Sequence, residues 1–174
     1  KVNMSTEIWV VADQKLDGSI RKVTFEVISE AKRSMADKLG GPVCGVLLGS
    51  GVGDKASELA KYGAEKVYVV DNENLKDFNP DGYVKALSEL IKKHSPKIVL
   101  TGNTSFTEDY IPRVASRVSS GLAMDCVSIG LTDDNRLKIE RYSHSSRAIS
   151  TQEFHDSEIT VSYTHLRAHE TSYD

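Results

Sequence analysis

The sequence has 174 residues, of which 39% are hydrophobic and 27% are charged. This composition is typical of a folded water-soluble domain, and it excludes a disordered chain and a membrane-embedded one. The net charge is −3, from 22 Lys and Arg residues against 25 Asp and Glu residues, without a basic stripe, which argues against a nucleic-acid partner. The length predicts one compact domain with a sizeable core.

The sequence contains no signal-peptide pattern and no apolar run long enough to cross a bilayer. We therefore expect no membrane insertion and a cytoplasmic location, or the mitochondrial matrix if the source is eukaryotic. Cys44 and Cys126 each lie in an apolar run without a second cysteine nearby, so we expect two buried thiols in a reducing compartment.

Short apolar runs alternate with stretches of helical spacing over the first 120 or so residues. The apolar runs predict strands over residues 7–12, 43–48, 66–70 and 97–101. The helical stretches cover residues 22–39, 54–62 and 79–93, and a fourth is marked by Ile111, Val114 and Val118. Because the strands show no polar alternation, both of their faces are expected to be buried. The pattern predicts an α/β fold, a doubly wound and mostly parallel sheet with helices on both sides.

After Gly121 the alternation of strands and helices stops. Three partly alternating runs over residues 125–131, 136–142 and 147–154 predict strands with only turns between them. We expect these antiparallel C-terminal strands to extend the parallel sheet or to lie beside it.

A glycine-rich loop, Gly49-Ser-Gly51-Val-Gly53-Asp54, follows the second predicted strand. Such a loop before a helix can cradle phosphate, but the dinucleotide fingerprint requires a third glycine where this chain has Asp54. A carboxylate there satisfies the helix dipole and repels phosphate. We therefore expect a tight turn capped by Asp54.

The loops after the first and fourth predicted strands are better candidates for a ligand site, because open α/β sheets bind ligands beyond the carboxyl ends of their strands. These loops are Ala12-Asp13-Gln14 and Gly102-Asn103-Thr104-Ser105. The candidate cofactor-binding residues are Gly102, Asn103, Thr104 and Ser105, which form a nucleotide-type loop of small polar residues. In the alternative interpretation, Thr104, Ser105 or Thr107 simply caps the following helix. The residue types leave both interpretations open.

No catalytic or metal-binding constellation stands out. The histidines outside the C-terminal stretch show no nucleophile signature nearby and are predicted to be surface polar residues: His94, His144 and His155. His165 and His169, followed by Glu170, have the spacing of metal ligands on one helix face, but no third ligand or supporting shell accompanies them. We predict no metal site and no catalytic residues.

Six sequence stretches occur in an order that is found in a known family. They are Ile8-Trp-Val-Val-Ala-Asp13, Leu39-Gly-Gly-Pro-Val-Cys-Gly-Val-Leu-Leu-Gly49, Leu59-Ala-Lys-Tyr-Gly-Ala-Glu-Lys-Val-Tyr-Val-Val-Asp71, Pro112-Arg-Val-Ala-Ser-Arg117, Gly121-Leu-Ala-Met-Asp-Cys126 and Arg141-Tyr-Ser-His-Ser-Ser-Arg-Ala-Ile149. Together they resemble the amino-terminal domain of the electron-transfer flavoprotein alpha subunit, which has an adenine-nucleotide alpha-hydrolase-like fold. The resemblance extends to Val161.

The resemblance implies part of a heterodimeric electron carrier that contains FAD and pairs an alpha with a beta subunit. Such carriers accept electrons from dehydrogenases, for example the acyl-CoA dehydrogenases of fatty acid oxidation. In the family, the FAD-binding motifs of the alpha chain lie in a carboxyl-terminal domain. We therefore expect this chain to act mainly as a scaffold that pairs with the beta subunit, and not to bind FAD alone. The alternative is a free-standing adenine-nucleotide-binding α/β module.

The last residues do not continue the resemblance. The stretch from Ser162 to Asp174 looks like a translated sequencing adapter and carries no hydrophobic periodicity. We expect residues 1–161 to form the domain, truncated before the FAD-binding domain, and residues 162–174 to be a non-native tail.

Overall fold

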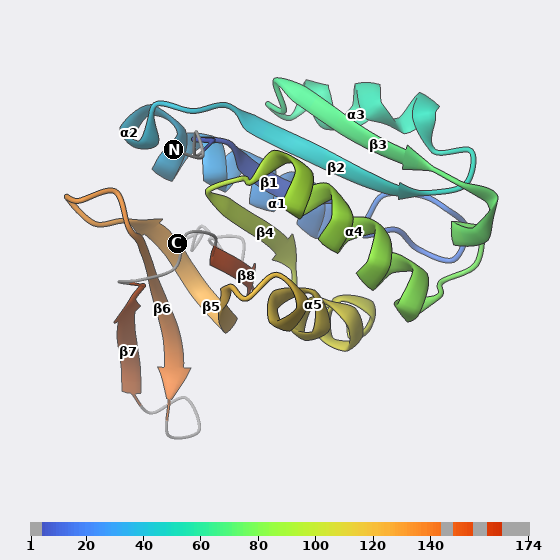
Figure 1. Cartoon of the computed structure of the whole chain (residues 1–174). Coiled ribbons are helices and arrows are strands. Elements are labelled where there is room, and N and C mark those ends of the chain that lie inside the picture. The colour runs from blue at the N-terminus through green and yellow to red at the C-terminus, as the bar shows by residue number, and fades with distance from the viewer. Residues whose placement is uncertain (1–4, 144–147, 155–159, 165–174) are drawn as a thin grey trace, which may run out of the picture.

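The structure, a computed structural model, describes residues 5–143, residues 148–154 and the backbone of residues 160–164. Its core is one eight-stranded sheet with the strand order β3-β2-β1-β4-β8-β5-β6-β7 (Figure 1). The strands are β1 (Ile8–Val11), β2 (Val43–Gly49), β3 (Lys66–Asp71), β4 (Ile98–Gly102), β5 (Gly121–Leu131), β6 (Leu137–Ser143), β7 (Ala148–Glu153) and β8 (Thr160–Thr164). Neighbouring strands from β3 to β5 are parallel, whereas β5, β6 and β7 are antiparallel.

The helices lie between the parallel strands in the chain, as the sequence predicted. They are α1 (Lys22–Ala31), the π-helix η1 (Lys32–Ala36), α2 (Asp37–Leu39), the 3₁₀ turn η2 (Gly53–Lys55), α3 (Ala56–Lys61), the 3₁₀ turn η3 (Glu73–Leu75), α4 (Pro80–His94) and α5 (Ser105–Arg117). The first three follow one another without a break, which confirms the helix predicted over residues 22–39.

Local sequence explains where the helices begin and end. Gly40 ends α2 with a left-handed φ of 68°, a conformation that glycine adopts without a steric penalty. Asn79 caps α4 by accepting a hydrogen bond from the Gly82 backbone N–H at 3.3 Å, and Pro80 occupies the first helical position.

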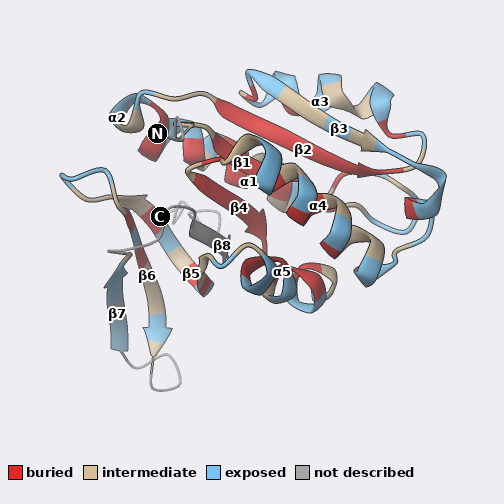
Figure 2. Cartoon of the chain, viewed as in Figure 1, coloured by how far each residue is buried: buried red, intermediate tan, exposed pale blue. Residues whose placement is uncertain are grey.

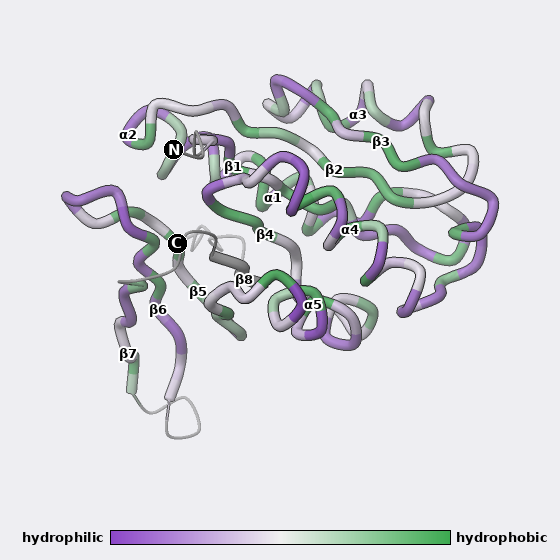
Figure 3. The backbone as a smooth tube through the Cα atoms, in the orientation of Figure 1, coloured by the Kyte–Doolittle hydropathy of each residue, from purple (hydrophilic) through white to green (hydrophobic). Residues whose placement is uncertain are grey.

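Both faces of the parallel strands β1, β2 and β4 are buried, because successive side chains along a strand point to opposite sides. The expectation of two buried faces is wrong for β3, which is the edge strand and has no buried residue. Ile8 and Val10 of β1 belong to the cluster that contacts α1 and α3, whereas Trp9 and Val11 belong to the cluster that contacts α4 and α5. All four β1 side chains are fully buried (Figure 2). Hydrophobic residues accordingly run along β2, while α4 alternates between hydrophobic and hydrophilic positions (Figure 3). The predicted doubly wound α/β fold is confirmed.

The antiparallel strands continue the same sheet, which settles the alternative that the sequence left open. Ile129 of β5 and Ile139 of β6 extend the α1-side core, whereas β7 is almost entirely exposed and forms the sheet edge (Figure 2).

Strand β8 lies between β4 and β5 and is parallel to both. Residues 162–164, the first three of the predicted tail, belong to this strand. Residues 165–174 lie outside the described part of the chain, as do His144, His155 and the His165–His169 pair. The expectation that residues 162–174 are non-native stays a prediction.

Candidate functional site

The loops singled out after β1 and β4 lie at the point where the strand order of the sheet reverses. From β1 the chain proceeds through β2 to β3 on one side, and β4 then pairs with β1 on the other side. Val11 is the register partner of Thr101, so the two strands end side by side. Ligands of open α/β sheets bind at such a reversal point.

Asp13, two residues after the end of β1, is a buried carboxylate at this reversal point. Its carboxylate lies 2.9 Å from the Arg21 Nε, and its side chain is 6% exposed. Burial raises the pKa of Asp13, and a hydrogen bond from Thr104 and the positive charge of Arg21 offset this only in part. Thr104 of the β4 loop therefore lies close enough to Asp13 of the β1 loop to lower the pKa of its carboxyl group.

Thr104 caps helix α5. Its side-chain oxygen accepts a hydrogen bond from the Thr107 N–H at 3.3 Å, and its own N–H donates to the Thr107 hydroxyl at 2.9 Å. The Thr107 hydroxyl also donates to the Gly102 carbonyl at 2.8 Å. The capping role that the sequence offered as one alternative is therefore present, and Ser105 is an exposed residue of the first turn.

Gly102 and Asn103 serve the packing of this edge. A Cβ atom at Gly102 would lie 2.4 Å from the Val23 Cγ1, so the glycine makes room for helix α1. The Asn103 side-chain amide donates to the Asp125 carboxylate at 2.8 Å, which links the β4 loop to β5. No comparison with known proteins bears on the proposed nucleotide contacts of Gly102, Asn103, Thr104 and Ser105, which stay a prediction.

A cavity of about 150 Å³ lies beside this loop, beyond the ends of β1 and β2. None of the four predicted residues lines it, although Asp13, Gln14 and the next residue in α5, Phe106, do. Four aromatic side chains form much of the wall: Phe78, Tyr83, Phe106 and Tyr110. The ring centroids of Phe78 and Phe106 are 4.5 Å apart, and those of Tyr83 and Tyr110 are 5.5 Å apart.

These aromatic residues were not predicted from the sequence. They lie in α4, in α5 and in the segment before α4, so no single sequence window brings them together. The available signal was that aromatic side chains occur at the start of both helices, next to the carboxyl edge of the sheet, where a ligand site was expected.

The glycine-rich loop after β2 forms a tight turn, but its cap differs from the expectation. Asp54 does not cap the helix: no side-chain hydrogen bond is present at the N-terminus of η2. Instead the Asp71 carboxylate at the end of β3 accepts a hydrogen bond from the Gly51 N–H at 2.8 Å. The turn places Gly49, Ser50 and Lys55 on the cavity.

A polar and aromatic cluster covers the amino ends of the parallel strands, at the other end of the strands from the cavity. Glu7 accepts hydrogen bonds from the Trp9 indole N–H at 2.8 Å and the Tyr68 hydroxyl at 2.9 Å, and the Lys66 ammonium lies 3.2 Å away. His94 was predicted to be a surface polar residue at a helix end, and it is the last residue of α4. Its ring is half-buried and lies 4.7 Å from the Tyr68 ring, because α4 ends over this cluster.

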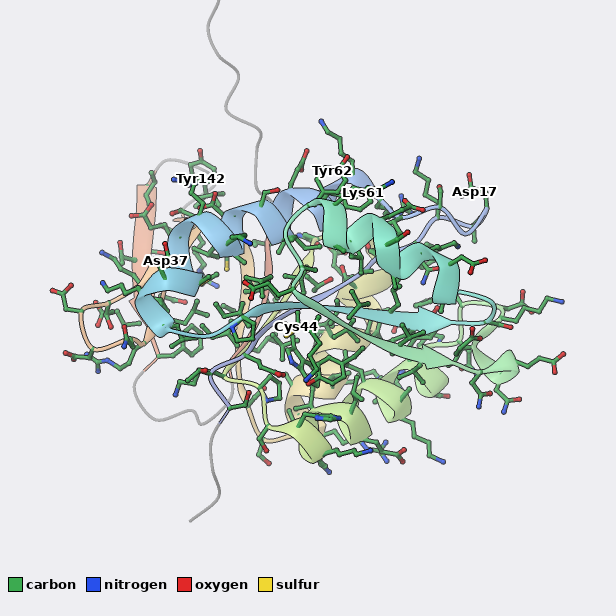
Figure 4. All side chains as sticks on the ribbon, turned by 90° about the horizontal axis from the view of Figure 1, so that it is seen from above. Asp17, Asp37, Cys44, Lys61, Tyr62 and Tyr142 are labelled. Carbon is green, nitrogen blue, oxygen red and sulfur yellow. The ribbon has the colours of Figure 1, made fainter. Side chains whose placement is uncertain are left out.

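The remaining predictions concern metal ligands, membrane helices and cysteines, and they are compared with the structure over its described residues. Within them, no group of three or more His, Cys, Asp or Glu side chains could hold a metal ion, and no helix is long and apolar enough to cross a membrane. Cys44 and Cys126 are buried, as predicted, and Cys44 lies inside the molecule in Figure 4. Burial, with the nearby Glu7 charge, raises the pKa of Cys44 to about 12.

Fold and site define a doubly wound α/β domain with a small cavity at its strand-order reversal. The chain belongs to the electron transfer flavoprotein domain family, whose model matches residues 8–165. It is 40% identical over 139 residues to the electron transfer flavoprotein subunit alpha of Thermoanaerobacterium thermosaccharolyticum, a match that covers 80% of this chain and 41% of the relative. These comparisons confirm the resemblance that the sequence motifs indicated.

Two further relatives are similar to the chain at nearly the same level. The electron transfer flavoprotein subunit alpha of Clostridium acetobutylicum is 40% identical, over 74% of this chain and 38% of the relative. The acryloyl-CoA reductase electron transfer subunit beta of Anaerotignum propionicum is 38% identical, over 75% of this chain and 35% of the relative. The chain thus spans less than half the length of these relatives.

Proposed function

We propose that this chain is the amino-terminal domain of the alpha subunit of a two-chain, flavin-containing electron carrier. The observation that carries the proposal is the family match over residues 8–165, joined to relatives that are named as alpha subunits. The carrier accepts electrons from dehydrogenases such as acyl-CoA dehydrogenases and passes them to an acceptor. The Anaerotignum relative is named as the electron transfer subunit of an acryloyl-CoA reductase. This name supports an electron donor or acceptor that acts on CoA thioesters.

The flavin, which we propose to be FAD, supplies the electron-transfer chemistry when it is bound. The cavity beyond the ends of β1 and β2 does not fit it, because its volume of about 150 Å³ is far smaller than the roughly 300 Å³ or more that drug-sized ligands fill. We therefore propose that the flavin binds in the remaining part of the carrier and that this chain contributes no catalytic residue. The role of this chain is to form a rigid scaffold that pairs with the beta subunit.

A chimera tests the proposal directly. The 139-residue stretch of the Thermoanaerobacterium alpha subunit that aligns with this chain is replaced by the corresponding residues of this chain. The chimera is then produced together with the beta subunit of that organism. We expect it to copurify with the beta subunit and with flavin, and to accept electrons from the same dehydrogenase as the parent carrier.

Two controls make the outcome interpretable. The parent pair, produced in the same way, must assemble and contain flavin. A chimera with Leu100→Asp, which places a charge in the fully buried β4, should fail to assemble. Assembly of the parent together with a folded chimera that binds no beta subunit would contradict the proposal.

A further inference from the structure

We propose that an extended segment of a partner protein adds as a further strand to the outer side of β3 and places side chains in the groove between β3 and α4. The segment that fits has aliphatic side chains at alternate positions and acidic residues beside them. This interaction surface differs from the cavity beyond the ends of β1 and β2, and it goes beyond the carrier role proposed above.

Strand β3 is the first strand of the sheet and pairs with β2, and no strand of the described residues occupies its outer side. The N–H and C=O groups on that side are a template for a further strand. No residue of β3 is buried, although Val67, Val69 and Val70 are apolar, and Val69 is 40% exposed. Figure 2 shows the contrast with the fully buried β2. A further strand would hydrogen-bond to β3 and cover these valines.

A groove of about 440 Å³ lies next to β3 on the α4 side of the sheet. Its apolar part is formed by Val70 of β3, Leu75 of η3, and Ala86 and Leu90 of α4. The groove is hollow because α4 has small residues on this side. These are Ala86 and Gly82, where an added Cβ atom would lie 3.1 Å from the Leu75 Cδ2. The volume falls within the range of roughly 300–1,000 Å³ that ligand sites in proteins have.

The position of the groove directly beside an unpaired strand defines the occupant. Because successive side chains of a strand point to opposite sides, every second side chain of a strand added to β3 points to the α4 side, toward the groove. In strand addition, main-chain hydrogen bonds provide affinity and pockets for alternate side chains provide specificity. A helix or a small amphipathic molecule in the groove would leave the outer N–H and C=O groups of β3 unpaired. We therefore assign an extended segment.

Charge around the groove favours acidic residues in the segment. Lys85 and Lys93 of α4 line the groove together with one carboxylate, Glu89, and all three residues are exposed. This local excess of positive charge occurs in a chain with a net charge of −3. Because the charged groups lie at an exposed rim, we expect them to select between segments, while main-chain pairing and the apolar part of the groove provide most of the affinity.

Fluorescence anisotropy of labelled peptides tests the surface with the whole 174-residue chain. The probe is a capped peptide in which leucine and threonine alternate and which ends in a pair of glutamates. We expect it to bind with saturation. A peptide that ends in a pair of lysines should bind several-fold more weakly, and a peptide of the same composition with consecutive leucines should bind at least tenfold more weakly. Absence of saturable binding of the acidic peptide, or equal binding of the rearranged peptide, overturns the proposal.

N-methylation distinguishes strand addition from hydrophobic adhesion. Only every second N–H of an added strand faces β3, so the peptide is prepared with N-methyl groups on all leucines or on all threonines. One of these two peptides should bind at least tenfold more weakly than the parent peptide, and the other should bind nearly as well. Equal affinities of the two methylated peptides, whether binding is retained or lost, overturn strand addition.

A variant that fills the groove locates the binding. Ala86→Leu introduces a larger side chain that is equally suited to a helix, and it should weaken binding of the acidic peptide at least tenfold. Ala60→Leu on α3 is the matched control, because Ala60 is exposed and lies outside the lining of the groove. Equal peptide affinity of the two variants would overturn the site.

A charge reversal provides a second test if Ala86→Leu does not fold, because it changes only exposed residues. Lys85→Glu/Lys93→Glu should reverse the preference, so that the peptide ending in lysines binds better than the acidic one. Lys22→Glu/Lys61→Glu changes the net charge by the same amount on exposed residues of α1 and α3 and should keep the original preference (Figure 4). The same preference in both double variants would contradict the assignment of an acidic segment.

Sedimentation velocity of the chain alone tests the other occupant of this surface, a second copy. Dimerisation that excludes the acidic peptide would assign the outer side of β3 to a second copy and overturn the assignment to a partner segment. These measurements require neither flavin nor a beta subunit. A failure of the chimera to assemble therefore leaves the β3 surface testable, and an absence of peptide binding leaves the carrier role intact.

Discussion

Strand β1 has a carboxylate near each end, and the pKa values of the two carboxyl groups are shifted in opposite directions. Glu7, before the strand, accepts hydrogen bonds from Trp9 and Tyr68 and lies beside Lys66. Asp13, after the strand, is paired with Arg21 and is more deeply buried. For both residues burial is the largest influence and raises the pKa. At Glu7 the hydrogen bonds together outweigh burial and the pKa is lowered, whereas at Asp13 they do not and the pKa is raised.

The difference distinguishes a structural edge of the sheet from a candidate binding edge. The amino ends of the parallel strands form what we call the amino edge. There the rings of Trp9, Tyr68 and His94 contact one another beside the hydrogen-bonded carboxylate of Glu7. At the carboxyl ends of the parallel strands, the aromatic rings line a cavity, and burial raises the pKa of Asp13 beside it. A buried titratable group with a shifted pKa next to a cavity is a feature of candidate functional sites.

The largest effect is expected at the amino edge. Trp9→Ala removes a fully buried side chain of the α4-side core and the indole donor to Glu7. We expect the free energy of unfolding to fall by about 3–5 kcal/mol, measured by urea denaturation. Trp9→Phe, which preserves most of the packing but not the donor, should cost clearly less. If Trp9→Ala were nearly neutral, the amino edge would not be the tightly packed structural edge described here.

A smaller effect is expected where β4 ends. Gly102→Ala places a methyl group 2.4 Å from the Val23 Cγ1, and the overpacking should lower the free energy of unfolding by about 1–3 kcal/mol. Gly130→Ala in β5 is the matched control, because nothing lies within 4 Å of the added Cβ atom there. Both variants are compared by thermal and urea unfolding. Equal stability of the two variants would mean that Gly102 is not needed for the packing of α1.

Much of the parallel half of the fold was predictable from local sequence, for a physical reason. A strand buried on both faces must be apolar throughout, and β1, β2 and β4 show this in uninterrupted runs such as Ile8–Val11. The position of β8 between β4 and β5 was not predictable in the same way. Its pairing with Ile98–Gly102 joins residues about sixty positions apart, and local pattern does not encode such pairing.

The candidate site was predicted only in part. The strand-order reversal followed from the expected topology, and Asp13 and Gln14 do line the cavity. The aromatic wall and the half-buried position of His94 depend on how α4 and α5 are oriented against the sheet. Side-chain contacts between such elements are set by tertiary packing, which periodicity alone does not determine.

The smallest effects provide the most direct comparison of the two edges, because they are expected to differ in sign. Near neutral pH, Glu7→Gln should lower the free energy of unfolding by about 1 kcal/mol, a modest value since the Glu7 side chain is partly exposed and screened by solvent. Asp13→Asn should leave the free energy of unfolding unchanged or raise it by up to about 1 kcal/mol. It removes a charge that is costly to bury, and Arg21, at 32% exposure, stays hydrated.

Their pH dependence separates charge effects from packing. The lowered pKa of Glu7 means that its stabilising contribution is present above the pKa of unfolded glutamate and is lost as the pH falls through the folded value, so wild type and Glu7→Gln should converge in acid. The raised pKa of Asp13 means that protonated Asp13 favours the fold at low pH and that this contribution is lost as the pH rises through the folded value. Asp13→Asn should therefore gain on wild type as the pH rises. Urea denaturation at intervals from about pH 2.5 to about pH 8 measures both differences. Parallel pH profiles for the two variants would show that the carboxylates at the two ends of β1 are electrostatically equivalent, and would contradict the opposite pKa shifts of Glu7 and Asp13.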